Sequence, residues 1–288
     1  MTRLGPNRYG KAEVRVVSIA RGTAPDGGDV IRDRCVSTSL SGDLAAAHRD
    51  GDNANVLATD TQKNVVNVLA KRLGDVEPEA FALALARHFV AGPITRARVA
   101  VDEYGWTRIG THDHSFHRSG DLTRTTVVVL DADAGPSVVS GVEDLVVLNT
   151  TDSEFHGFPR DEYTTLAETH DRILATRVSA RWRYRSAEVD WSGAFGLARR
   201  ALLDAFAGTY SYSLQQTLYA MGAAIIEAVP DICEVRLALP NKHHFLVDLA
   251  PFGETNDNEV YYAADRPYGL IEGTVLADDA SDPGLAWS

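Results

Sequence analysis

Two histidine-containing segments hold the residues whose types and spacing are most suggestive of chemistry. In the first, His112 and His114 flank Asp113, and in an extended segment these two histidines share one side, where they can ligate a metal together with a carboxylate. Such short matches are common by chance, and Gly110 and Gly120 border this one. We therefore expect a solvated loop here, with the centre of a metalloenzyme as the alternative.

The second segment, residues 240–245, places an amide, an amine and two imidazoles between apolar stretches: Asn241, Lys242, His243 and His244. Polar clusters between two strands are common places for functional sites. An ordinary polar turn that begins at Pro240 is equally compatible with the sequence, so the spacing alone does not decide between a site and a turn.

Composition and missing motifs exclude several classes of protein. With 28 Lys and Arg against 40 Asp and Glu, the formal net charge is −12, which disfavours non-specific binding to nucleic acids or anionic membranes. No GxGxxG, P-loop, HExxH or GxSxG motif occurs, so standard dinucleotide, triphosphate, zinc-protease and serine-hydrolase sites are disfavoured. The only cysteines, Cys35 and Cys233, cannot form a disulfide framework or a CxxC site. We see no bilayer-spanning run and no secretory signal, and therefore expect a cytoplasmic protein.

The elements that must position these residues follow a similar order twice. Alternating apolar residues predict strands, and apolar residues three or four apart predict helices. In the first pass the expected strands are residues 12–20, 30–40, 96–109 and 124–131, and the expected helices are residues 59–73 and 78–90. In the second pass, which starts near Gly141, the expected strands are 145–148, 178–184, 234–238, 244–249, 259–263 and 270–275, and the expected helices are 161–175, 193–206 and 213–229. The acidic tail from Ala277 is expected to be loose.

Several helix ends carry local predictions. Thr59 followed by Gln62 fits a capping box with Thr59 as the N-cap, and Gly74 suits the C-cap of the same helix. Arg172 is expected in the last turn of its helix and Gln215 in the first turn of another. Each of these four residue types is therefore explained without any functional role.

Each pass gives mainly antiparallel strands with a pair of helices, so the predicted fold class is α+β with helices on one face of a sheet. The two halves are residues 1–140 and 141–288. The face without helices must be unusually polar or must be covered by something else, and oligomer formation is one way to cover it.

Six groups of segments, in order along essentially the whole chain, resemble the motifs of the urate oxidase (uricase) family. They are Tyr9–Arg15; Ala58–Asn64; Phe155–Leu166 with Asp171–Leu174; Ser213–Thr217; Leu239–Phe245; and Asn258–Ala263 with Pro267–Ile271. Several long motifs in the family's order are far more specific than any one of them alone.

This resemblance implies two tandem T-fold (tunnelling fold) domains, residues 1–140 and 141–288, in a homotetramer with a central tunnel and active sites at subunit interfaces. It implies purine degradation by oxidation of urate with O₂ to 5-hydroxyisourate and hydrogen peroxide, with no organic cofactor and no metal. Because the last three residues are not the Ser-Lys-Leu peroxisomal address, we expect the bacterial, cytoplasmic type.

By the same resemblance, Lys11, Thr59 and His243 form a proton relay that strips a proton from urate. A threonine hydroxyl both donates and accepts, and histidine exchanges protons near neutral pH, so these residue types suit the task. Thr59 also contacts the substrate, and together with Asn241 it would hold O₂ or the attacking water above the ring.

The remaining residues implied by the resemblance bind urate. Arg172 offers parallel donors, Gln215 offers one donor and one acceptor to a lactam edge, and Phe155 stacks on the purine. Asp60 and the backbone near Leu214 would complete the in-plane contacts. Leu214 stands where many members of the family carry Val, which makes the edge of the pocket slightly tighter.

A binding protein without catalytic activity is the alternative to the enzyme. A non-catalytic purine- or pterin-binding protein of the same fold would keep Arg172 and Gln215 and lose the relay. The presence of Lys11, Thr59 and His243 together favours the enzyme.

Overall fold

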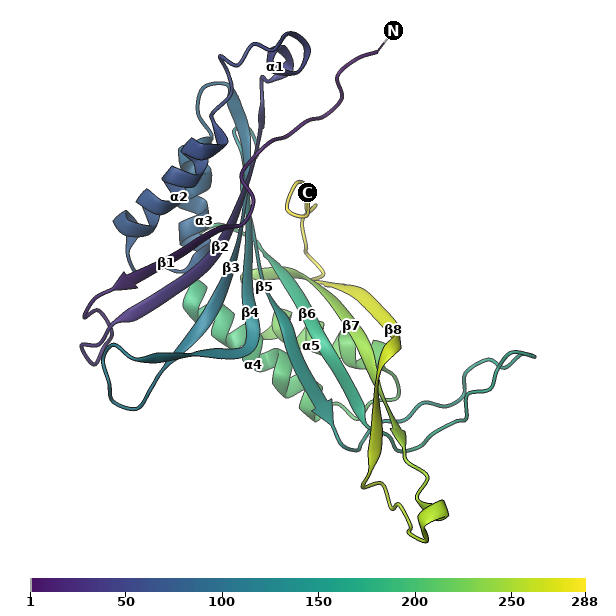
Figure 1. Cartoon of the computed structure of the whole chain (residues 1–288). Helices are drawn as coiled ribbons and strands as arrows, with labels where there is room; N and C mark the ends of the chain where they lie inside the picture. The colour runs from purple at the N-terminus through teal and green to yellow at the C-terminus, as the bar shows by residue number, and fades with distance from the viewer. Residues whose placement is uncertain (1) are drawn as a thin grey trace.

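The structure is a computed structural model that describes residues 2–288, with only the backbone described at residue 265. Eight antiparallel strands form one sheet in the order β1 to β8, so each strand pairs with its neighbours in sequence (Figure 1). The strands are β1 Val14–Ala20, β2 Val30–Gly42, β3 Ile94–Arg108, β4 Phe116–Asp131, β5 Gly135–Asn149, β6 Leu174–Tyr184, β7 Ile232–Leu246 and β8 Tyr261–Leu276.

Two pairs of long helices cover one face of this sheet (Figure 1). The helices are α1 Ala45–Asp50, α2 Thr59–Leu73, α3 Pro78–Phe89, α4 Trp191–Gly208 and α5 Leu214–Ala228, with a 3₁₀ turn η1 at Ala250–Phe252. Apart from the short α1 and η1, the order of two strands, two helices and two strands occurs twice. The sequence predicts two passes of a similar order, but with one more helix and two more strands in the second. Among the described residues, no helix is both long and apolar enough to cross a membrane.

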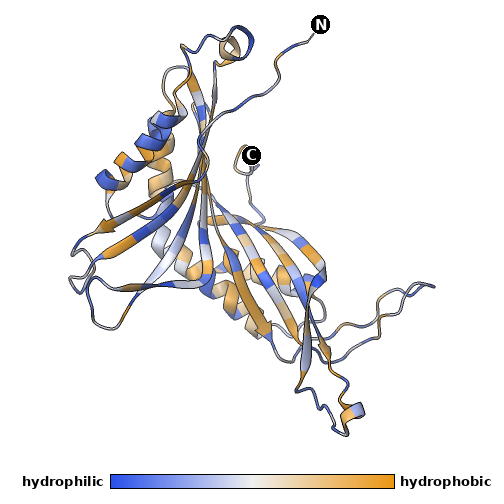
Figure 2. Ribbon diagram, in the orientation of Figure 1, coloured by the Kyte–Doolittle hydropathy of each residue, from blue (hydrophilic) through white to orange (hydrophobic). Residues whose placement is uncertain are grey.

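Strand alternation builds the core between sheet and helices (Figure 2). In β3, for example, Ala97, Val99 and Val101 are fully buried, while the neighbouring Arg96 and Arg98 are only partly buried. The helices contribute apolar side chains at helical spacing to the same core. The largest fully buried side chains of the two halves include Phe81, Phe89, Trp182, Leu202 and Met221. The second face of the sheet stays without helices and carries charged residues.

The tail beyond β8 differs from the expected loose segment because specific contacts fix it. Arg98 donates from Nε to the carbonyl oxygen of Ser288 at 2.8 Å, and the Arg236 guanidinium lies 4.0 Å from the centre of the Trp287 ring. Arg183 donates to the carbonyl oxygen of Ser281 at 2.7 Å.

The helix predicted over residues 161–175 is wrong, so Arg172 does not lie in a helical turn. Asp161 instead accepts hydrogen bonds from the backbone of Tyr163 and the hydroxyl of Thr164, a local arrangement that competes with helix formation. The chain then runs without regular structure to β6, which begins at Leu174. In the same half, the four short strands predicted over 234–249 and 259–275 are two long ones, β7 and β8.

The capping box predicted at Thr59 is also wrong. Thr59 is already the first residue of α2, and Ala58 is the N-cap with no side-chain cap. The buried Gln62 side chain does not bond to the N-cap N–H, because its Oε1 accepts from Thr38 at 2.7 Å and its Nε2 donates to the carbonyl of Leu57 at 3.2 Å. Gly74 does end the helix, as predicted.

Candidate active site

A pocket of about 610 Å³ lies at one end of the second half, between the loop before β6, the start of α5, and strands β7 and β8. This volume is typical of a small-molecule site, roughly 300–1,000 Å³. Six residues expected from the sequence line it, and we call them the pocket group: Phe155, Arg172, Leu214, Gln215, Asn241 and His243.

Arg172 is the cationic centre of the pocket group. Its Nε donates to the hydroxyl of the buried Ser153 at 3.2 Å, and its guanidinium carbon lies 5.2 Å from the centre of the Phe155 ring. Burial lowers the pKa of Arg172 from its ordinary value. Within the described part of the chain its two terminal nitrogens have no hydrogen-bond partner, so they can donate to a ligand.

Phe155 is held by its backbone at the base of a long arm, residues 155–169, between β5 and β6. Its N–H donates to the carbonyl of Thr169 at 2.8 Å, and the Thr169 N–H donates back at 3.0 Å. The ring stacks on Phe158 at 5.0 Å with an interplanar angle of 15°. Phe155 of this stacked pair lines the pocket, and an aromatic platform of this kind suits a flat ligand.

The first turn of α5 brings Leu214 and Gln215 to the pocket. Ser213 caps this helix by accepting from the N–H of Gln216 at 3.2 Å. The other early N–H groups lack partners within the helix, and the helix dipole makes this end positive. Together with Arg172, it gives the pocket a preference for an anionic or carbonyl-rich ligand.

Asn241 and His243 come from β7 on either side of a shift in its register with β8. A bulge of this kind bends the strand and redirects its side chains, and such irregularities are common beside functional sites. Burial, followed by the positive charges of Arg172 and His244, lowers the pKa of His243. The ring is therefore a neutral proton acceptor at neutral pH.

Lys11, Thr59 and Asp60 form a second set, which we call the Lys11 group. Thr38 joins them: its hydroxyl accepts from the N–H of Lys11 at 3.1 Å and donates to Gln62 of α2 at 2.7 Å. Thr59 and Asp60 open that same helix. A hydrogen bond from Lys63, and more weakly the charge of Lys11, lower the pKa of Asp60.

The two groups lie in different halves of the chain. None of the Lys11 group is among the described residues that line the pocket. Thr59 and Lys11 are half-buried and Asp60 is exposed, so this group forms an open surface. One chain therefore brings the pocket group together and leaves the Lys11 group apart from it.

Two residues that position the site were missed from the sequence. Thr38 lies between Val36 and Leu40 on the buried face of β2, and a buried hydroxyl on an apolar face needs a partner, which was the available signal. Ser153, which binds Arg172, lies in a loop with no pattern that marks it.

The possible metal ligands differ from those suggested by the sequence. His112, Asp113 and His114 lie exposed in the loop between β3 and β4, as expected for a solvated loop, and do not form a close cluster. In the described part of the chain, the one group of at least three close potential ligands is Glu154, His156 and His170. The two cysteines are free thiols.

Comparison with known proteins agrees with the geometry. The family model described as Uricase matches residues 7–129 and 138–272. The uricase of Arthrobacter globiformis is 53% identical over 287 residues, which are 99% of this chain and 93% of that protein. The uricase of Dictyostelium discoideum is 39% identical over 283 residues, 96% of this chain and 98% of that protein.

Solved structures give the same result. The crystal structure of the uricase from Arthrobacter globiformis has a TM-score of 0.93 at 52% sequence identity, and the match covers 98% of this chain and 97% of that one. The expected α+β fold of two tandem T-fold domains is thereby confirmed. The chain belongs to the uricase family.

Proposed function

We propose that this chain oxidises urate with O₂ and water to 5-hydroxyisourate and hydrogen peroxide. Two electrons leave the purine and reduce O₂ to the peroxide, while the oxygen of water enters the product. No organic cofactor or metal takes part in the proposed reaction. The observation that carries the proposal is the pocket group, in which three separate segments of the chain supply the six expected side chains.

In this proposal the pocket group contacts both the edge and the flat face of the urate ring. The free terminal nitrogens of Arg172 donate to a carbonyl oxygen and a ring nitrogen. Gln215, whose amide bonds to no described residue, and the first N–H groups of α5 at Leu214 bind the opposite edge, and Asp60 adds an in-plane contact. Phe155 stacks on the ring.

The relay consists of Lys11, Thr59 and His243. Among the described residues the amine of Lys11 has no hydrogen bond or ion pair, so its lone pair or protons are available for exchange. Thr59 passes the proton, and the neutral ring of His243 accepts it. Asn241 and Thr59 hold O₂ or the attacking water above the urate ring.

The separation of the two groups supports a homotetramer with active sites at subunit interfaces. The Lys11 group of one chain would meet the pocket group of another. The sheet has open edges at β1 and β8, and unpaired edge strands are templates for pairing with another chain. The helix-free, charged face would then line the interior of the assembly.

Two smaller proposals go with this one. We keep the proposed division into residues 1–140 and 141–288, a boundary that falls inside β5. We also propose a cytoplasmic location, because the free thiols Cys35 and Cys233 fit a reducing compartment.

The deciding experiment follows the loss of urate absorbance together with O₂ uptake and peroxide formation. We expect all three in equal molar amounts, unchanged by prior chelation. Folded, tetrameric protein without turnover would contradict the proposal, and a tight urate complex that persists in air without peroxide would indicate the non-catalytic binding protein instead.

A further inference from the structure

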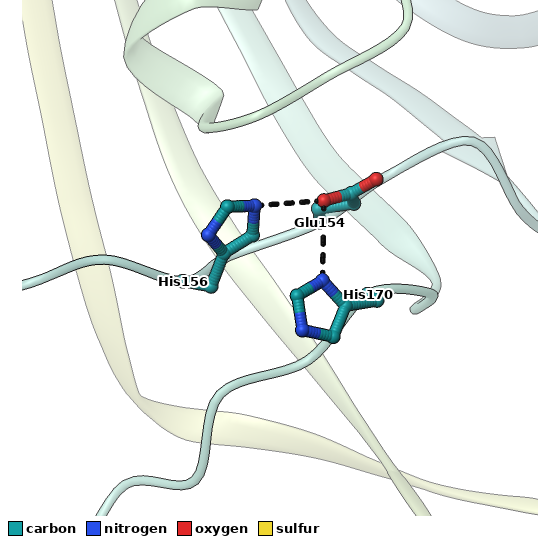
Figure 3. A group of neighbouring side chains, drawn as sticks. All are labelled: Glu154, His156 and His170. Carbon is teal, nitrogen blue, oxygen red and sulfur yellow. Dashed lines mark hydrogen bonds and ion pairs between the residues drawn. The ribbon is translucent and has the colours of Figure 1, made fainter.

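Glu154, His156 and His170 form a cluster outside the pocket, at the base of the 155–169 arm (Figure 3). The Oε2 atom of Glu154 lies 2.9 Å from Nε2 of His156 and 3.4 Å from Nδ1 of His170. The two imidazole rings are 4.7 Å apart, and both point toward the same carboxylate. Three atoms of metal-ligating type therefore lie within 4.8 Å of one another.

The backbone explains why these three side chains meet. Phe155 and Thr169 pair as antiparallel neighbours, so Glu154 and His170 flank that pair from opposite strands. In extended chain, successive side chains point to opposite sides, so Glu154 and His156 lie together on the side away from Phe155. The cluster therefore occupies the back of the two strands whose front carries the aromatic platform of the pocket.

We propose that Glu154, His156 and His170 bind a divalent transition-metal ion of the zinc class. Two imidazole nitrogens and one carboxylate oxygen are a ligand set that Zn²⁺ accepts, with water in the fourth position. Ligand atoms around a tetrahedral zinc lie roughly 3.3 Å apart, because each lies about 2.0 Å from the metal. The distances of 2.9 and 3.4 Å to Glu154 are close to this spacing.

A neighbouring tyrosine helps to hold the carboxylate of Glu154 in place. The hydroxyl of Tyr210 donates to Oε1 of Glu154, the oxygen that faces away from the histidines. Partners that hold a ligating carboxylate in this way are a regular part of protein metal sites. Glu154 has 15% of its side chain exposed, against 40% and 70% for His156 and His170, so an ion can enter from solvent.

A bound ion would link the two strands at the base of the arm. An ion held by Glu154 and His156 on one strand and by His170 on the other ties the base of the arm together. Phe155 lies on the first of these strands, and Arg172 follows His170 by two residues. Bound metal would thus restrict the backbone that carries these two residues, without entering the pocket or the reaction.

The test uses the full-length protein, treated with chelator, dialysed and titrated with ZnSO₄ in a calorimeter. We expect one Zn²⁺ per chain, with affinity lowered roughly 100-fold in His156→Ala and His170→Ala and roughly 10-fold in Tyr210→Phe. The double variant His112→Ala/His114→Ala is the matched control, because it removes the same number of exposed histidines from a loop elsewhere and should bind as the parent does. Glu154→Gln keeps the shape of the side chain and serves as the second variant if a histidine variant does not fold.

Amide hydrogen exchange independently tests whether the bound ion restricts the backbone of the two strands. Zn²⁺ should slow amide exchange at the base of the arm in the parent protein and not in His170→Ala. Binding that survives the cluster variants, or that is lost equally in the control, overturns the proposal. Failure to saturate one site per chain at millimolar Zn²⁺ overturns it too.

Discussion

The Lys11 group and the pocket group each use a buried hydroxyl to hold a cationic residue, but the hydroxyl binds a different part of that residue in each group. In each, a buried hydroxyl holds the segment of a cationic residue: Thr38 binds the backbone N–H of Lys11, whereas Ser153 binds the guanidinium of Arg172 itself. The amine of Lys11 has no partner among the described residues, whereas the guanidinium of Arg172 is anchored through its Nε. A relay needs a group that can exchange protons, and a clamp needs donors with a set direction, so the difference matches the proposed roles.

The strongest test of the relay is Lys11→Met. We expect kcat to fall by roughly 10²–10⁴-fold, the usual contribution of a positioned acid or base, because Met fills the space without carrying a proton. The affinity for a non-reactive urate analogue should change little, since the pocket group is intact. Stopped-flow or steady-state kinetics and a binding titration measure the two effects separately.

Lys63→Met is the matched control for that change. Lys63 lies one turn into α2, pairs with Asp60 and is half-buried, as Lys11 is. It should keep nearly all turnover. If Lys11→Met were as active as Lys63→Met, the relay assignment would be wrong.

Arg172→Ala should damage binding and turnover together, because its contacts to urate exist in both the ground state and the transition state. Loss of charge-assisted hydrogen bonds of about 1.5–3 kcal/mol corresponds to roughly 10–150-fold in affinity for the analogue. Arg177→Ala is the control and should bind normally, because it removes an exposed arginine of β6 that pairs with Asp144 of β5. An unchanged analogue affinity in Arg172→Ala would remove this residue from the clamp.

Mixing the two inactive variants tests whether the groups meet between chains. If the Lys11 group of one subunit completes the pocket group of another, co-expressed Lys11→Met and Arg172→Ala chains form some sites that are intact on both sides. Random assembly makes about a quarter of the sites intact, so activity should rise to about a quarter of the parent value. Separately purified variants that do not exchange subunits are the control. Activity that stays at the level of the single variants would place each site within one chain.

The contrast between the groups also shows how far the sequence leads. Local periodicity predicted α2, α3 and the strands beside them, because their apolar stripes also face the core in the structure. It failed at residues 161–175, where the turn at Asp161 outcompetes an apparently helical pattern. The pocket residues were named through the family resemblance, whereas the contact of Ser153 with Arg172 spans 19 residues and depends on tertiary structure alone.

The two positioning hydroxyls should have smaller and different effects. Thr38→Val removes the link between Lys11 and α2 and should lower kcat several-fold with KM nearly unchanged. Ser153→Ala frees the Arg172 guanidinium and should raise KM several-fold. Thr38→Val loses two hydrogen bonds and Ser153→Ala loses one, at about 1 kcal/mol each, so both should fold. Thr38→Ser and Ser153→Thr restore the hydroxyl and should recover the parent kinetics, which a purely structural effect of side-chain volume would not produce. If Thr38→Val and Ser153→Ala changed KM equally, the proposed difference in role between the Lys11 group and the pocket group would be wrong.

The smallest expected effect concerns the acid side of the pH profile. Burial and the charges of Arg172 and His244 lower the pKa of His243 below its ordinary value of 6.5. The neutral ring is therefore present at neutral pH and is lost only as the pH falls through this lowered pKa, so kcat/KM should decline only below pH 6.5. His244→Gln removes one positive neighbour, raises the pKa of His243 and should move the acid limb to higher pH. His112→Gln, far from the pocket, should leave the profile in place, and a limb that shifts in the opposite direction for His244→Gln would show that His243 does not set it.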